Sequence, residues 1–333
     1  MKSDLELLAR EIWDTTPKVV AISDLTDPVN EPYRPVDIGD FSAMEIQPKE
    51  FILAPWLSVS SLNMVHAYRG VGKTYFCLEI AKAVSTGTAS MGTWLAPKPR
   101  KVLYIDGEMA AIDLQERINL LFNGQKFPPA GHFTLLSPFN QTRAMPNLAD
   151  QESRDLVTKL IRDTQADLVV IDNLSCLIRG EFAENEAKWW EPVQPWALAR
   201  RAEGTSILFV HHSGKSGKQR GTSKTEDIMD TVIQLRRPAE AGAEDGAIFE
   251  VAFEKNRALR GKDVEPFEAK LETVGGKTSW STKSKEASML YRIRALADEG
   301  LSNRDIASML NISPGTVGYH LKKASNLISD ESY

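Results

Sequence analysis

The chain has 333 residues, of which 42% are hydrophobic and 26% are charged, and its formal net charge is −5 at pH 7. These values are typical of a soluble globular protein with one large domain and one small unit, and they argue against a protein that coats nucleic acid with its whole surface. No apolar run reaches the roughly 18 residues of a membrane span, and the start lacks the pattern of a secretory signal. We therefore expect a cytoplasmic protein without a membrane partner.

Residues 1–50 predict one short helix followed by an arm. Leu5, Leu8, Ala9 and Ile12 have the spacing of one helical face. The Pro-rich stretch after them has little periodicity and carries many acidic residues. Packing of this arm against a neighbouring subunit and disorder are both open.

Residues 51–274 predict an α/β core. Short apolar runs alternate there with longer amphipathic segments, as in a mostly parallel sheet flanked by helices. The expected strands span residues 62–67, 102–106, 168–172, 207–211, 231–235 and 248–254. The polar residues 275–285 predict a linker, and residues 286–328 predict a small all-α unit.

A phosphate-binding loop is predicted at residues 67–74, which read AYRGVGKT between an expected strand and an expected helix. Gly70 and Gly72 let backbone N–H groups approach phosphate oxygens, and the helix N-terminus adds a favourable dipole. Lys73 is expected to reach the β- and γ-phosphates of ATP, and the Thr74 hydroxyl to bind Mg²⁺. The expected nucleotide contacts are Ala67, where the strict pattern has glycine, Arg69, Gly70, Val71, Gly72, Lys73, Thr74 and Tyr75.

Carboxylates follow two of the expected strands at the edge where ligands bind in open α/β sheets. Asp172 ends the apolar run LVVI and is expected to serve the metal ion. Glu108 follows the strand over 102–106 and is the candidate for positioning the attacking water. Asp106 is its rival for that role, or it satisfies the turn.

Two histidines, His211 and His212, end a further expected strand and lead into a basic, glycine-rich segment over 213–224. A polar side chain between a γ-phosphate and a loop can couple nucleotide state to loop position, so one of the two is expected to be a sensor. Two hydrogen-bonded structural histidines are the alternative. DNA contacts by the core are expected from the basic side chains of this segment, namely Lys215, Lys218, Arg220 and Lys224.

Five segments, AYRGVGKT, VLYIDGEM, LVVIDN, LFVHHSGK and FEKNR, resemble in order the motifs of RecA/DnaB-type ATPases, and more narrowly the RepA-like ATPases of plasmids and prophages. The resemblance covers roughly residues 51–272. It implies a RecA-like P-loop core in which Glu108 is the catalytic glutamate and Asp172 the second carboxylate motif. His211 or His212 matches the sensor.

The resemblance also implies an assembly and its ligands. Such ATPases form rings, usually hexamers, with ATP and Mg²⁺ between neighbours and single-stranded DNA in the central channel. The basic segment 213–224 matches the channel loop. Lys255 and Arg257 match the cations that reach the neighbour's γ-phosphate, where an arginine can raise hydrolysis by about 10³ to 10⁵. An exposed, charged strand end is the alternative for these two residues.

From residue 287 the chain predicts three short helices. Ser302 with Asp305 forms a start signal for the second helix, and Ser313 with Pro314 forms one for the third. The apolar residues between these signals have helical spacing, so a compact tri-helical unit is expected.

Residues 301–321 resemble the helix-turn-helix of LuxR-type regulators and of sigma-factor region 4, whose second helix enters the major groove of duplex DNA. The side chains expected outside, toward DNA, are Thr316, Tyr319, His320, Lys322 and Lys323. A bundle that binds only protein is the alternative, because Gly315 and Gly318 leave few side chains for reading bases.

The leading hypothesis is an ATP-hydrolysing ring ATPase on DNA, resembling a replicative helicase of a mobile element. A second hypothesis is an ATP-dependent regulator of transcription or replication that binds DNA without unwinding it. A third is a recombination ATPase that forms filaments on DNA. The sequence leaves these three open.

Overall fold

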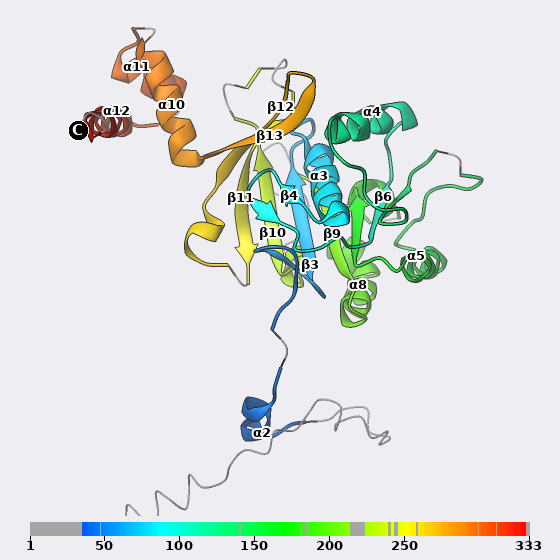
Figure 1. Cartoon of the computed structure of the whole chain (residues 1–333). Helices are drawn as coiled ribbons and strands as arrows, with labels where there is room; N and C mark the ends of the chain where they lie inside the picture. The colour runs from blue at the N-terminus through cyan, green and yellow to red at the C-terminus, as the bar shows by residue number, and fades with distance from the viewer. Residues whose placement is uncertain are drawn as a thin grey trace, which may run out of the picture. The chain divides into compact units, whose positions relative to one another are not determined.

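The computed structural model describes residues 35–46, 48–139, 141–180, 182–183, 186–213, 224–238, 241–242, 246–257, 259–298, 300–310 and 312–330 (Figure 1). The chain divides into two compact units, Met1–Lys49 and Glu50–Tyr333. In the first unit, helix α2 (Ile38–Ala43) is capped by Asp37, whose side chain accepts a hydrogen bond from the Gly39 amide at 2.8 Å. The helix expected around residues 5–12 lies outside the described residues.

The second unit is built on a nine-stranded sheet with the order β13-β12-β11-β10-β3-β9-β8-β6-β7. Strands β10 to β7 in this order are parallel, and β11, β12 and β13 continue the sheet antiparallel. Their bounds are β3 (Leu62–Ala67), β6 (Val102–Asp106), β7 (Phe133–Leu136), β8 (Leu168–Asp172), β9 (Ser206–His212), β10 (Thr231–Arg236), β11 (Ile248–Asn256), β12 (Phe267–Val274) and β13 (Lys277–Ser284). The predicted α/β fold with a mostly parallel sheet is confirmed.

Helices cover both faces of the parallel strands, which explains why those strands are apolar without alternation. Side chains on one face of the sheet, such as Val170 and Leu208, pack with α3 (Lys73–Thr86) and α4 (Ala111–Phe122). Side chains on the other face pack with α5 (Gln151–Thr164) and α8 (Val193–Ala202). The shorter elements are β1 (Phe51–Leu53), β2 (Leu57–Ser58), β4 (Ala89–Ser90), β5 (Trp94–Leu95), α6 (Leu174–Leu177), α7 (Ala187–Trp190), α9 (Lys224–Asp227) and η3 (Gly261–Val264).

The polar stretch 275–285, expected to be a linker, instead contributes a strand to the sheet. Gly275 and Gly276 adopt positive φ in the turn of a hairpin, and the rest of the stretch is mostly β13, paired with β12 from Phe267↔Ser284 to Val274↔Lys277. The strand is polar because it lies at the edge of the sheet, where its side chains are mostly exposed.

The C-terminal residues form the expected three helices, α10 (Lys285–Asp298), α11 (Asn303–Met309) and α12 (Pro314–Asp330). Their small core consists of buried apolar side chains, namely Ile293, Ile306, Ala307, Leu310 and Val317. The Ser302 hydroxyl accepts from the Asp305 amide at 3.3 Å, and the Ser313 hydroxyl accepts from the Thr316 amide at 3.1 Å. Both predicted start signals are thus used as helix caps. None of the helices in the described residues has the length and apolar character that crossing a membrane requires.

Candidate nucleotide site

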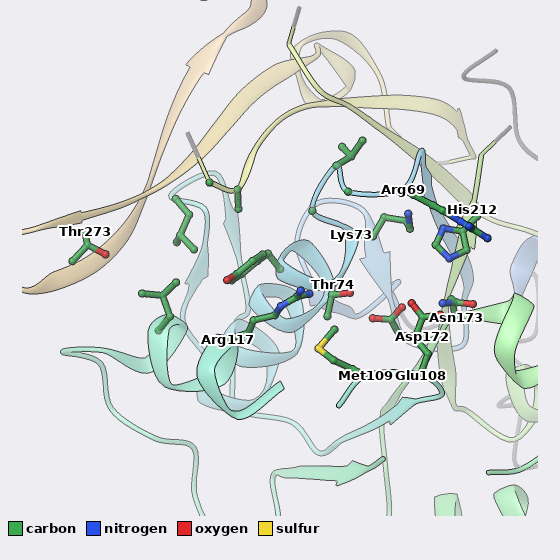
Figure 2. Close-up of a pocket in the computed structure, with 18 residues that line it drawn as sticks. Arg69, Lys73, Thr74, Glu108, Met109, Arg117, Asp172, Asn173, His212 and Thr273 are labelled. Carbon is green, nitrogen blue, oxygen red and sulfur yellow. The ribbon is translucent and has the colours of Figure 1, made fainter. Parts of the chain in front are cut away.

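A pocket of about 630 Å³ opens at the carboxyl ends of the parallel strands (Figure 2). It is lined by the loop after β3, by residues at or just after the ends of β6, β8 and β9, by α4, and by residues just before β11 and in the second half of β12, which lie at the same end of the sheet. The lining residues are Arg69, Gly70, Val71, Gly72, Lys73, Thr74, Tyr75, Glu108, Met109, Arg117, Leu120, Asp172, Asn173, His212, Gly246, Ala247, Leu271 and Thr273. The pocket therefore gathers the predicted phosphate loop, both carboxylates and one histidine.

The phosphate loop has the backbone that its glycines permit. Gly70 and Gly72 have φ of 79° and 116°, a region that other residues rarely adopt, and a Cβ on Gly72 would lie 3.1 Å from the Phe249 ring. The Lys73 ammonium donates to the carbonyls of Ala67 and Tyr68 at 3.0 and 3.2 Å. Ala67, one of the expected contacts, does not line the pocket, and its carbonyl holds the lysine instead.

Burial gives Lys73 an unusual acidity. Its ammonium is desolvated, which lowers its pKa to about 8, while the negative charge of Asp172 opposes the change. A lysine in this state gains strongly from a phosphate, because the phosphate replaces the lost hydration of the ammonium. The loop is therefore suited to a polyanionic ligand.

Asp172 lies buried at the end of β8 beside the loop. Its carboxylate accepts a hydrogen bond from the Tyr104 hydroxyl at 2.6 Å and another from the Thr74 side chain. Burial raises the pKa of Asp172, and these two hydrogen bonds work against that rise. Thr74 and Asp172 together offer a hydroxyl and a carboxylate oxygen, the hard ligands that Mg²⁺ prefers, so the donor set fits this ion.

Glu108 also faces the pocket, and its surroundings favour the ionised form. Burial works to raise its pKa, but hydrogen bonds from the Cys176 thiol and the Asn173 side chain, together with the charge of Lys73 and other nearby groups, lower it overall. The thiol sulfur lies 3.0 Å from Glu108 Oε2. Burial and this carboxylate raise the pKa of Cys176 to about 12, which keeps the thiol a proton donor. Glu108 is therefore held as an acceptor.

Asp106, the rival of Glu108, holds the turn. Its carboxylate accepts from the Met109 amide at 3.1 Å, and it does not line the pocket. Burial and the nearby Asp172 raise its pKa to about 6. The strand end thus separates one carboxylate that faces the ligand from one that fixes the backbone.

The two neighbouring histidines point to opposite faces of β9, because successive side chains of a strand alternate. His212 lines the pocket together with Glu108. His211 is fully buried, with its ring 5.7 Å from that of Trp189. The geometry therefore favours His212 for the sensor role and gives His211 a packing role.

The pocket has a second side, on which Tyr75 was the one residue predicted from the sequence. The Arg117 guanidinium from α4 lies 5.1 Å from the centre of the Tyr75 ring. Leu120, one turn further along α4, and Leu271 and Thr273 from β12 complete this side. A flat cation, an aromatic ring and apolar side chains suit a nucleobase. Arg117 and Leu120 have helical spacing, which is too common a signal to mark a site.

Comparisons with known proteins identify the family of the chain. A family model described as AAA domain matches residues 27–218, more than half of the 333 residues. The chain belongs to the AAA domain family. A model described as helix-turn-helix domain matches residues 291–324, so the protein is an AAA-type P-loop ATPase with a C-terminal helix-turn-helix. No curated protein matches the sequence. Among solved structures, it is similar to a KaiC-like protein of Pyrococcus horikoshii OT3, with 15% identity and a TM-score of 0.45, over 67% of this chain and 90% of that one.

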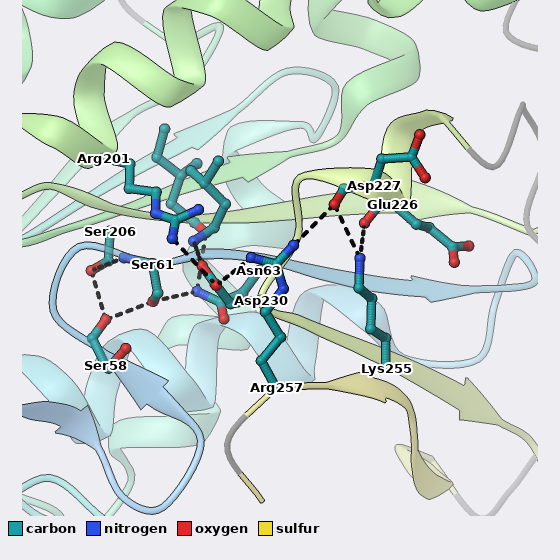
Figure 3. A network of polar contacts seen from close by, with 12 residues as sticks. Ser58, Ser61, Asn63, Arg201, Ser206, Glu226, Asp227, Asp230, Lys255 and Arg257 are labelled. Atoms are coloured by element: carbon teal, nitrogen blue, oxygen red, sulfur yellow. Dashed lines mark hydrogen bonds and ion pairs between the residues drawn. The ribbon is translucent and has the colours of Figure 1, made fainter. Parts of the chain in front are cut away.

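Two predicted site residues of this AAA-type ATPase, Lys255 and Arg257, are not among the residues that line the pocket. Figure 3 shows their surroundings. The Lys255 ammonium donates to the carbonyls of Glu226 and Asp227 at 2.5 and 3.2 Å. The Arg257 guanidinium donates to the carbonyl of Asp227 at 3.1 Å and lies 3.5 Å from Asp230 Oδ1. Both cations thus gather around the end of α9, on the opposite edge of the sheet from the AAA-type phosphate loop.

The predicted DNA contacts of the AAA-type ATPase divide into two groups. Lys215, Lys218 and Arg220 lie outside the described residues, and Lys224 is the exposed first residue of α9. In the helix-turn-helix, Tyr319 is 60% exposed, and Lys322 is exposed.

His320 was expected outside but is buried. It lies three residues after the core residue Val317 on α12, and therefore on the same inward face. Thr316 is half-buried, and the side chain of Lys323 lies outside what the structure describes. The prediction that His320 faces outward toward DNA is therefore wrong.

Proposed function

We propose that this AAA-type ATPase hydrolyses ATP as a homo-oligomeric ring, usually a hexamer in ATPases that it resembles, and uses the cycle to move on DNA. The observation that carries the proposal is the pocket in which Lys73, Glu108, Asp172 and His212 converge. Phosphoryl transfer to water needs a clamp on the phosphates, a metal ligand and a carboxylate for the water. All three kinds of group face one cavity.

Each pocket residue has one task in this proposal. Mg²⁺, when bound with ATP, neutralises charge that develops on the phosphates. Lys73 binds the β- and γ-phosphates, and Thr74 and Asp172 hold the metal ion. Glu108 accepts a hydrogen bond from the attacking water and orients it. His212 senses whether the γ-phosphate is present.

The transition-state cation comes from a neighbouring subunit in this proposal. The Arg257 amide donates to the Asp230 carbonyl, and the Asp230 amide donates to the carbonyl of Leu62, which begins β3. The phosphate loop starts at the other end of β3, five residues later, or about 17 Å away at roughly 3.3 Å per residue. An arginine on the far edge is placed to serve another chain's ATP. Single-stranded DNA is proposed to contact the basic segment 213–224, and duplex DNA the helix-turn-helix.

The decisive experiment is steady-state ATP hydrolysis by the full chain alone, with single-stranded DNA and with duplex DNA. Lys73→Ala, which removes the phosphate clamp, is the control for contaminating activity. Strong stimulation by single strands supports a translocating, helicase-like motor, and an assay of strand separation then follows. Full turnover by a folded Lys73→Ala variant overturns the site.

A second candidate function, an ATP-dependent regulator that binds duplex DNA without unwinding it, is favoured by one specific observation. Leu271 and Thr273 of β12 line the pocket, and the next strand, β13, continues directly into α10 of the helix-turn-helix. Nucleotide binding is thus close in the chain to the DNA-binding module. Duplex affinity that rises with ATP, without single-strand stimulation or strand separation, distinguishes this function from the first.

A further inference from the structure

The two cations at the far edge of the sheet share a buried acidic neighbour. Asp230 is 8% exposed and directly precedes β10 in the chain. Its Oδ2 accepts from the Leu62 amide at 3.0 Å. Its Oδ1 lies 3.6 Å from an Arg201 guanidinium nitrogen and 3.5 Å from one of Arg257. Oδ2 therefore serves the backbone at the start of β3, whereas Oδ1 faces the two arginines (Figure 3).

We propose that Asp230 is a positioning residue, which fixes the Arg257 guanidinium in the orientation that a neighbouring subunit's ATP requires. This inference rests on the proposed function, because it assigns Asp230 a task through Arg257.

Arg257 needs a residue that holds its side chain in one orientation. Its side chain is 49% exposed at the end of β11, where a long side chain would otherwise sample many rotamers. The backbone amide of Arg257 is fixed by the Asp230 carbonyl at 3.1 Å, and the guanidinium by Asp230 and by the Asp227 carbonyl. A cation acts in a transition state in proportion to how well it is placed beforehand. Asp230 therefore supplies order to an exposed group.

A purely structural role for Asp230 is the competing explanation. The carboxylate also accepts from the Leu62 amide, and that contact supports the start of β3. An asparagine can still accept from this amide, but its side chain carries no charge for the two arginines. Asp230→Asn therefore keeps the shape and removes the electrostatic contact, whereas Asp230→Glu keeps the charge.

Three variants separate the two explanations. Asp230→Asn is expected to lower kcat for ATP by about 10-fold to 100-fold, as for a lost hydrogen bond to a charged group, with ATP affinity unchanged. Asp230→Glu is expected to turn over faster than Asp230→Asn, and the reverse order overturns the inference. In an Arg257→Ala background, Asp230→Asn should have little further effect, because the two residues act as one unit.

Mixing of subunits tests whether Asp230→Asn impairs the arginine that a subunit supplies to its neighbour's pocket. Lys73→Ala subunits have an intact Arg257 but a damaged pocket, and Asp230→Asn subunits have the reverse, so mixed assemblies should hydrolyse ATP faster than either variant alone. The matched control is Ser206→Ala, in the same buried network: the Ser206 hydroxyl donates to the Ser58 carbonyl at 2.8 Å and is not among the partners of Arg257. Ser206→Ala should lower the midpoint of thermal unfolding. Mixed with Lys73→Ala subunits, it should hydrolyse ATP at the rate that wild-type subunits reach in the same mixture.

The outcomes also distinguish this inference from the proposed function. If the wild-type chain does not hydrolyse ATP, or if Arg257→Ala retains full turnover, the proposed function fails and this inference with it. If Arg257→Ala is impaired while Asp230→Asn is fully active, only the inference fails. A slow Asp230→Asn variant that gains nothing from Lys73→Ala subunits also overturns it.

Discussion

The two edges of the sheet hold cations in opposite ways. At the pocket edge, Lys73 is buried and its pKa is lowered to about 8. At the far edge, Arg257 is half exposed and rests against a carboxylate and a carbonyl. A buried lysine is poorly solvated until a phosphate arrives, so it suits a ligand of its own chain. An exposed arginine with a fixed orientation suits a ligand that another chain brings.

The strongest test of this difference is Arg257→Ala. We expect kcat to fall by about 10³ or more, since an arginine finger contributes about 10³ to 10⁵, while ATP affinity remains near that of wild type. Hydrolysis and equilibrium binding of a fluorescent ATP analogue measure the two effects. Addition of Lys73→Ala subunits should restore part of the turnover, and a complete lack of recovery would falsify donation between subunits.

Glu108→Gln tests the pocket edge without removing the phosphate clamp. Glutamine cannot accept a proton from water, so we expect kcat to fall by about 10² or more with ATP binding retained. A control variant is Asp106→Asn at the same strand end, because Asp106 holds the turn and does not face the ligand. Equal losses in kcat for the two variants, both folded, would contradict the separation of their roles.

The pH dependence of ATP binding follows from the lowered pKa of Lys73. Below about pH 8 the ammonium is already charged, and affinity should be nearly constant. Above that pH the free lysine loses its proton and must regain one to bind phosphate, so affinity should fall up to about tenfold per pH unit. Calorimetry in buffers of different ionisation enthalpy should detect proton uptake above pH 8. Lys73→Arg stays charged, and the same slope in that variant would assign the effect to another group.

The smallest effect is expected at the third cation, Arg117, which lies over the Tyr75 ring. Arg117→Ala should raise KM for ATP several-fold, as for the loss of about 1 kcal/mol of cation–π and stacking contact, with kcat little changed. Steady-state kinetics with ATP measure this split. A loss of kcat with constant KM would place Arg117 near the reacting phosphate instead of the base.

The parallel half of the fold and the pocket's phosphate side could be predicted from the sequence. Buried parallel strands are continuous apolar runs, and three of the six predicted strands, over residues 62–67, 102–106 and 168–172, match the structure at both ends. The loop over 67–74 is one contiguous motif, so its geometry depends mostly on neighbouring residues. The local sequence pattern is therefore sufficient to predict these strands and the phosphate loop.

The remainder depends on contacts between residues that are distant in sequence. The strand β13 has few apolar residues, and its double glycine is as typical of a linker as of a hairpin turn. The choice between His211 and His212 requires the face of β9 that α3 covers. Arg117 joins the pocket only after α4 packs beside α3. His320 turns inward because Val317 sets the buried face of α12.

Strand β11 has a mechanical consequence for an assembly of the proposed kind. Ala247 lines the pocket just before the strand begins, and Lys255 and Arg257 lie at its other end, about 30 Å away for nine residues. The ladder with β10 runs from Arg236↔Glu250 to Thr231↔Asn256, with one register shift between Val232 and Ile233, and it fixes the strand between those ends. In such an assembly, each subunit would hold its own nucleotide pocket and the cations offered to the neighbouring nucleotide at the two ends of this one strand.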